Sequence, residues 1–214
     1  MLNVKNVAVL LCAVVLSGCG MLSSFMGGGG GSSSNVNWDE LADNSNKVLG
    51  DIYSGTRLLV LALADMDDAL NRQDKAAYLR AQVESISEDG SVSGDYDIGE
   101  TVDQLGSFTE ERQKLLEEIG DLSADQKQKL AQALAKYVTG GVKYVNGVKT
   151  AKDIVQNAKN APFDKLTAFT EIIEVTPTAV KGAQAFVANV PSFVKLATAK
   201  DVKAPEIPAG ALEF

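Results

Sequence analysis

The sequence predicts an all-α protein in which residues 38–200 form an antiparallel bundle of about four to six helices. Apolar residues recur every three or four positions over most of this range, which is the period of one helix face. The period-two alternation of half-buried strands is missing, and only five of the 214 residues are proline. The range is also long enough to bury a sizeable core as one domain.

The first helix is expected to begin at Asn37, because Glu40 three residues later gives the spacing of a capping box. The segment 56–64 is apolar around most of the helix, which predicts a place at the centre of the bundle. Residues 71–74 either break this helix or continue it into a second helical stretch that ends near Ser87.

Two further capping-box patterns predict two further helices. Ser107 with Glu110 is expected to open a helix that ends at Gly120, which suits a helix C-terminus. Ser123 with Gln126 is expected to open the longest helix of the bundle, because apolar residues follow it at helical spacing for the longest stretch.

Prolines divide the last part of the bundle. Pro162 suits the first turn of a helix whose apolar side includes Phe163. Pro177 and Pro191 are expected to separate two further helical pieces, because proline removes a backbone donor and disrupts a helix interior.

A tyrosine-valine-x-glycine motif occurs twice in the longest predicted helix, at 137–140 and 144–147. A spacing of seven residues places both copies on one helix face. Each glycine costs about 1 kcal/mol relative to alanine in a helix, so a benefit must offset it. Close helix packing by Gly140, Gly141 and Gly147 is the favoured interpretation, and a hinge or ligand slot is the alternative. The expected partner surface consists of small residues: Gly182, Ala183, Ala185 and Ala188.

Residues 89–100 have the spacing of an EF-hand loop, with glycine at position 6 and glutamate at position 12. This resemblance implies a weak Ca²⁺ site. A solvated connection between helices is the favoured interpretation, because serines stand where stronger sites carry carboxylates and no second loop follows. The candidate ligands are Asp89, Ser91, Ser93, Asp95, Asp97 and Glu100.

The sequence Leu16-Ser17-Gly18-Cys19 ends an apolar run, 7–16, that is too short to span a bilayer. This arrangement resembles the signal peptide and lipobox of bacterial lipoproteins. The resemblance implies removal of residues 1–18, a diacylglycerol on Cys19 and acylation of the new amino terminus. Several acyl chains together give a durable membrane anchor. The alternative is a cytosolic protein whose first helix is apolar.

Residues 19–37 are rich in glycine and serine, which predicts a flexible tether behind the anchor. A random coil of this length has a typical end-to-end distance of about 24 Å. Gly20 follows the cysteine where a retention signal would place aspartate. By resemblance to lipoproteins of diderm bacteria, this implies transfer to the outer membrane with the domain in the periplasm, and surface exposure stays open.

The predicted mature chain offers few groups for catalysis. The sequence contains no histidine, and its cysteines are Cys12, which would leave with the signal peptide, and Cys19, which would carry lipid. This removes the usual ligands of zinc, copper and haem together with the commonest general base and thiol nucleophile. No catalytic residue and no cofactor other than Ca²⁺ is therefore predicted.

The net charge of −8 hides a difference between two parts of the chain. Residues 38–125 hold 21 acidic and 7 basic residues, whereas residues 126–203 hold 5 acidic and 12 basic residues. The favoured interpretation is that the two halves pack against each other or solvate different faces, and a basic face for anionic lipid or an acidic partner is the alternative. Nucleic acid is not an expected partner, because the chain is acidic and few aromatics stand among the lysines.

The leading functional prediction is a non-enzymatic, lipid-anchored helical protein of the cell envelope that acts as an adaptor or accessory subunit. Residues 201–214 read as an extended tail that is either a docking peptide or a frayed terminus. The alternative is a helical binding module for an apolar ligand such as an acyl chain. Four aromatic residues would line its cavity: Phe163, Phe169, Phe186 and Phe193.

Overall fold

The computed structural model describes residues 36–94 and 96–214, and these ranges form an all-α bundle, as predicted. The predicted signal peptide, Cys19 and the tether up to residue 35 lie outside the described residues. None of the described helices is both long enough and apolar enough to cross a bilayer. The helical elements are α1 (Trp38–Ala69), α2 (Gln73–Ala81), α3 (Ile98–Glu118), α4 (Ala124–Ala158), the 3₁₀ turn η2 (Leu166–Phe169) and α5 (Thr170–Ala199).

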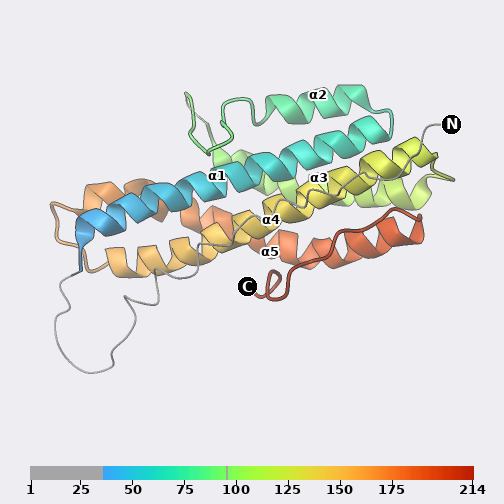
Figure 1. Ribbon diagram of the computed structural model, residues 1–214. Helices are drawn as coiled ribbons and strands as arrows, with labels where there is room; N and C mark the ends of the chain where they lie inside the picture. Colours follow the sequence, from blue (N-terminus) through green and yellow to red (C-terminus); the bar gives the residue numbers. More distant parts are fainter. Residues whose placement is uncertain (1–35, 95) are drawn as a thin grey trace, which may run out of the picture. The chain divides into compact units, whose positions relative to one another are not determined.

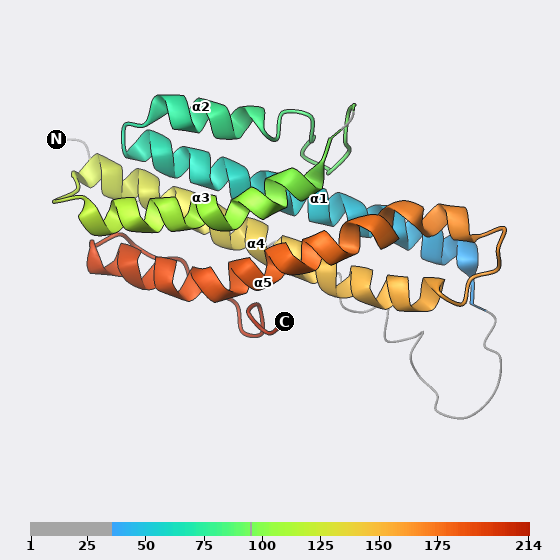
Figure 2. The same ribbon diagram turned by 180° about the vertical axis from the view of Figure 1, so that it is seen from behind.

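The two longest helices, α1 and α4, lie side by side and run antiparallel (Figures 1 and 2). Helix α5 runs antiparallel to α4, and α2 folds back along α1. Helix α3 runs antiparallel to α4 and parallel to α5, so helices that follow one another in the chain alternate in direction, as in an antiparallel bundle (Figures 1 and 2). Gly99 lies near Thr178, and the Gln113 side chain donates to the Asn189 carbonyl further along both helices.

The helix starts follow local side-chain caps. The Asn37 side chain accepts the backbone N–H of Glu40, and Ser123 forms a reciprocal capping box, so both predicted starts are confirmed. The start predicted at Ser107 is wrong. Helix α3 already begins at Ile98, because the Asp97 carboxylate accepts a backbone N–H of the first turn at 2.7 Å.

The break after α1 settles the alternative left open for residues 71–74. Asn71 adopts a left-handed conformation with φ of 59°, which asparagine tolerates better than most residues and which ends the helix. Helix α2 is shorter than expected, because it ends at Ala81 and is followed by turns up to Ser85.

The proline predictions are wrong. Helix α5 continues through both Pro177 and Pro191. Both prolines are exposed, so solvent can satisfy the carbonyl groups that lose their helical partner. Pro162 precedes a turn rather than a helix, and α5 begins only at Thr170. Phe163 is therefore not on an apolar helix face, and 91 % of it is exposed.

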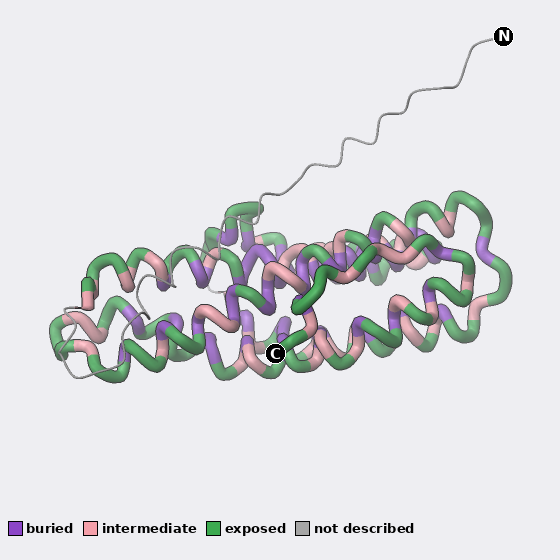
Figure 3. The backbone as a smooth tube through the Cα atoms, turned by 60° about the horizontal axis from the view of Figure 1, so that its bottom comes forward, coloured by how far each residue is buried: buried purple, intermediate pink, exposed green. Residues whose placement is uncertain are grey.

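The core lies between α1, α4, α3 and α5, and the buried positions recur along each helix at helical spacing (Figure 3). Three ion pairs connect the acidic first half to the basic second half, which supports the interpretation that the halves pack against each other. These pairs are Asp39–Lys165 at 2.7 Å, Asp51–Lys143 at 3.4 Å and Asp65–Lys136.

Candidate functional site

The predicted packing glycines lie at the contact between α1 and α4. A Cβ atom at Gly140 would lie 2.6 Å from the Cβ of Leu58 and 3.0 Å from the backbone nitrogen of Leu59. From the other helix, a Cβ atom at Gly55 would lie 2.8 Å from the backbone nitrogen of Tyr144. Real Cβ contacts are longer, so the two glycines allow the helix backbones to approach each other. The predicted packing glycines do not include Gly55, which is the partner of Gly140 on α1.

The other two glycines have different neighbours. Gly147 faces Ile52 of α1, whose Cγ1 would lie 3.1 Å from an added Cβ. Gly141 faces α5, where the ring of Phe186 occupies the space of a Cβ, at 1.9 Å. Gly141 therefore packs on α5, but against Phe186 rather than against the expected small residues, whereas Gly140 and Gly147 pack on α1. A ligand slot at these glycines is excluded, because side chains and backbone fill the space.

Part of the predicted calcium loop forms a small hairpin instead of an open ligand loop. Ile86 and Val92 form an antiparallel backbone bridge. The Asp89 carboxylate accepts the Ser87 hydroxyl and, at 3.0 Å, the Ser91 backbone N–H. These hydrogen bonds stabilise the charged form and lower the pKa of Asp89 to about 2.

The remaining candidate ligands also have internal partners. The Ser93 hydroxyl donates to a backbone carbonyl of the hairpin, Asp97 caps α3, and Glu100 accepts the Gln104 amide at 3.2 Å. Asp95 lies outside the described residues. Over the ranges that the structure describes, no group of three or more histidine, cysteine or carboxylate side chains is placed to hold a metal ion. The Ca²⁺ site stays a prediction that the described geometry does not support.

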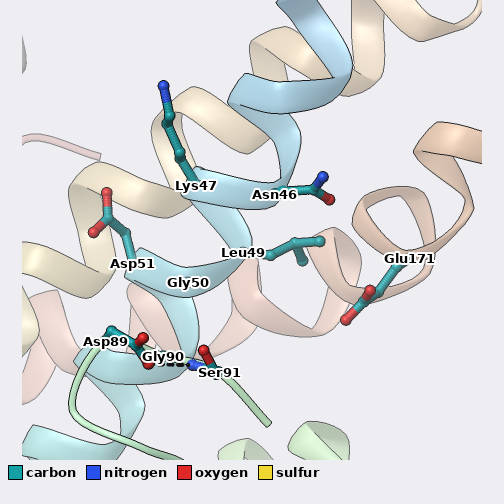
Figure 4. Close-up of a pocket in the computed structure, with 9 residues that line it drawn as sticks. All are labelled: Asn46, Lys47, Leu49, Gly50, Asp51, Asp89, Gly90, Ser91 and Glu171. Carbon is teal, nitrogen blue, oxygen red and sulfur yellow. Dashed lines mark hydrogen bonds between the residues drawn. The ribbon is translucent and has the colours of Figure 1, made fainter. Parts of the chain in front are cut away.

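A polar cleft of about 560 Å³ lies beside this hairpin (Figure 4). Gly90 packs the hairpin against α1, because its φ is +87° and an added Cβ would lie 2.0 Å from the carbonyl oxygen of Gly50. Across the cleft, Glu171 accepts the Tyr53 hydroxyl at 2.8 Å. Burial, and then this bond, raise the pKa of Tyr53. The lining residues are Asn46, Lys47, Leu49, Gly50, Asp51, Asp89, Gly90, Ser91 and Glu171.

A buried ion pair that the sequence patterns do not predict connects α1 to α3. The carboxylate of Asp67 and the guanidinium of Arg112 are in contact, and their side chains are 0 % and 1 % exposed. Arg72 lies 3.5 Å from the same carboxylate and also contacts Glu111. Burial raises the pKa of Asp67, and contact with Arg112 opposes this effect. Asp67 stands four residues after Leu63 on the apolar face, which is the signal that could have identified it.

A second set of ion pairs lies at the same part of α1. Arg80 of α2 contacts Asp65 at 2.9 Å and Asp68 at 2.6 Å, and Lys136 of α4 also contacts Asp65. The two sets of charges therefore connect four helices at one end of α1. Each carboxylate faces a basic side chain of a neighbouring helix, which is the arrangement of a structural network.

The aromatic residues proposed to line an acyl cavity fill the core instead. Phe169, Phe186 and Phe193 are at most 2 % exposed, and the ring of Tyr137 lies 5.4 Å from Phe186 and 5.6 Å from Phe193. The apolar space beside Phe193 is about 10 Å³, which is smaller than one acyl chain requires. Phe163 points to solvent. The three buried phenylalanines thus fill the core and do not line the cavity that the alternative function expects.

The C-terminal tail, residues 201–214, packs along the bundle. Asp201 forms an ion pair with Lys127 near the start of α4 at 3.2 Å, and Lys152 near its end lies 5.0 Å above the ring of Phe214. Val202 is 3 % exposed. Figure 1 shows the tail running back from the end of α5. The frayed-terminus alternative is therefore wrong, because apolar contacts and charges hold the tail.

No protein-family model, curated protein or solved structure matches the chain. The contacts above define the class of the described unit, which is a helical bundle with a close α1–α4 pair and a buried ion pair. Two large apolar side chains of the described residues stand out at the surface: Phe214 at the end of the tail, 38 % exposed, and Phe163, 91 % exposed. These features carry the proposals below.

Proposed function

We propose that this protein is a non-enzymatic, lipid-anchored adaptor or accessory subunit of a cell-envelope assembly. The observation that carries the proposal is the sequence Leu16-Ser17-Gly18-Cys19 behind a short apolar run. Acylated Cys19 is the membrane anchor, and the outer membrane with the bundle in the periplasm is the proposed location. Glycine and serine dominate the sequence between Cys19 and the start of α1, which suits a spacer.

The tail is the proposed docking element for a protein partner. Val202 and Ala211 are buried and hold the tail on the bundle, whereas Phe214 is 38 % exposed and Glu213 is exposed. A partner would therefore meet a short apolar and acidic segment in a defined position. Binding a segment that is already ordered avoids the cost of ordering it, which supports recognition in place.

In-cell crosslinking followed by mass spectrometry tests this proposal. The full chain at native expression is compared with a variant lacking residues 201–214 and with Phe214→Ser, which leaves Val202 in place. A stoichiometric envelope protein that is recovered with the full chain and lost from both variants is the expected result. Recovery of the full chain alone would contradict the adaptor function.

A separate measurement tests the anchor. Metabolic labelling with a palmitate analogue should mark the full chain and leave Cys19→Ala unlabelled. Labelling of neither protein would exclude the lipid anchor, whatever the crosslinking shows.

A further inference from the structure

One end of the helical bundle contains both the start of α1 and the connection between α4 and α5. Helix α1 begins directly after Asn37, and the connection between α4 and α5 lies beside this start (Figure 1). The ring of Trp38 packs edge-to-face on Phe169, with centroids 6.4 Å apart, and Asp39 contacts Lys165 at 2.7 Å. The connection 159–169 is therefore held at the end where the chain arrives from Cys19, and we call this the entry end.

Phe163 lies in this connection. It is 91 % exposed, more than any other large apolar side chain among the described residues. It follows Pro162, which is also exposed. Single exposed apolar residues are common on protein surfaces. The position of this one is informative, because the chain that leads to the predicted lipid joins the bundle at the same end.

The predicted tether is long enough for the entry end to reach the membrane. A coil from Cys19 to Asn37 has a typical length of about 24 Å, so the bilayer surface is within reach of Phe163. Tethering also gives a high effective concentration, which makes a weak contact sufficient. Moving one phenylalanine ring from water into an apolar environment favours the bound state by about ten- to a hundredfold.

The charges at the entry end indicate which lipids this contact requires. Asp39 pairs with Lys165, and the connection and the start of α1 also carry one exposed lysine, Lys159, and two exposed carboxylates, Glu40 and Asp164. An excess of basic residues is therefore lacking around Phe163 among the described residues. A contact at this end must be apolar and should form on uncharged bilayers, without the salt dependence of a basic surface.

We propose that the entry end rests on the bilayer, with the ring of Phe163 inserted at the interface between headgroups and acyl chains. This inference rests on the proposed lipid anchor at Cys19. The contact fixes which end of the bundle faces the membrane.

Fluorescence quenching of the lipidated full chain in phosphatidylcholine vesicles tests the contact. Trp38→Phe removes the only tryptophan and keeps an aromatic ring against Phe169. In this background, Phe163→Trp reports on the entry end, and Asp121→Trp, in the exposed α3–α4 connection, is the matched control. Lipids brominated near the glycerol should quench Trp at position 163 and shift its emission to the blue, and they should not quench Trp at position 121.

Intact mass spectrometry of the same samples separates the two proposals. If Cys19 carries lipid and positions 163 and 121 are quenched equally, the contact of Phe163 is refuted and the anchor stands. If Cys19 carries no lipid, the anchor is refuted and the inference that rests on it falls too. Lipid on Cys19 with quenching at position 163 alone supports both.

Discussion

Replacing Gly55 by alanine tests the close contact between α1 and α4. The new Cβ would lie 2.8 Å from the backbone nitrogen of Tyr144 and 2.9 Å from its Cα. Backbone atoms cannot rotate away as a flexible side chain can, so the two helices must separate. Gly106→Ala is the matched control, because Gly106 is also within a helix and an added Cβ there has no atom within 4 Å.

Two opposing effects determine the expected magnitude. Alanine is favoured over glycine in a helix interior by about 1 kcal/mol, and this gain applies to both variants. Overpacking a core costs about 1–3 kcal/mol, and the backbone contact places Gly55→Ala near the upper limit. Gly55→Ala should therefore lower the free energy of unfolding by about 1–2 kcal/mol, whereas Gly106→Ala should raise it by up to about 1 kcal/mol.

Urea titration followed by circular dichroism at 222 nm measures both changes. For a domain of this size the loss in Gly55→Ala corresponds to a fall in Tm of about 2–8 °C. A Gly55→Ala variant as stable as the unmodified protein would refute the argument that this glycine permits the helix contact. If Gly106→Ala is destabilised, helix propensity does not dominate at a position where the added Cβ has no neighbour, and this part of the argument is refuted.

The other predictions concern the buried ion pair, the hairpin and the tail. Arg112→Met should lower the free energy of unfolding by about 3 kcal/mol, because Asp67 then keeps only a more distant guanidinium, and adding Asp67→Leu should recover most of the loss in urea titrations. Ser87→Ala should raise the pKa of Asp89 from about 2 towards its ordinary value of 3.8 in an NMR titration. Because the folded pKa is the lower one, the stability that this carboxylate gives the hairpin is complete above about pH 4 and is lost as the pH falls through about 2. Val202→Asp should release the tail, giving faster proteolysis after residue 202 at unchanged helix content, and an unchanged cleavage rate would contradict the packing of the tail.

The sequence predicts the helical class and two helix starts because this information is local. A helix face repeats every three or four residues, and the caps at Asn37 and Ser123 involve residues three positions apart. The start of α3 differs from the prediction for a related reason. The spacing of residues 89–100 predicts a calcium ligand at Asp97, although a side-chain oxygen that can bind a cation can equally accept a backbone N–H at a helix start.

The prolines of α5 and the position of Phe163 depend on tertiary surroundings. A proline within a helix is tolerated where the carbonyl that loses its partner can reach water, and the exposure of Pro177 and Pro191 provides this. Exposure is a property of the packed bundle, which periodicity alone does not give. For the same reason, the apolar character of Phe163 does not show whether its side chain is buried or exposed.

The sequence indicates what role these glycines and charged residues have, but it does not indicate which residues they contact. The repeated glycines indicate close packing, but whether Gly140 meets α1 or α5 depends on how the helices are arranged. Asp67 and Arg112 are charged residues at positions on the apolar faces of their helices, where apolar residues are expected. That these two residues contact each other depends on the parallel placement of α1 and α3, which no local signal encodes.

The partnership of α1 with α4 also has a consequence for how the chain folds as it is synthesised. The surface of α1 around Gly55 is buried by residues around Gly140, and the chain between them must be made first. Contacts between residues so far apart in sequence form slowly, and apolar surface that is unburied in the meantime favours aggregation. Helix α1 is therefore synthesised first but is among the last helices to be fully buried. Its apolar surface is the part of the bundle that a chaperone would shield for the longest time.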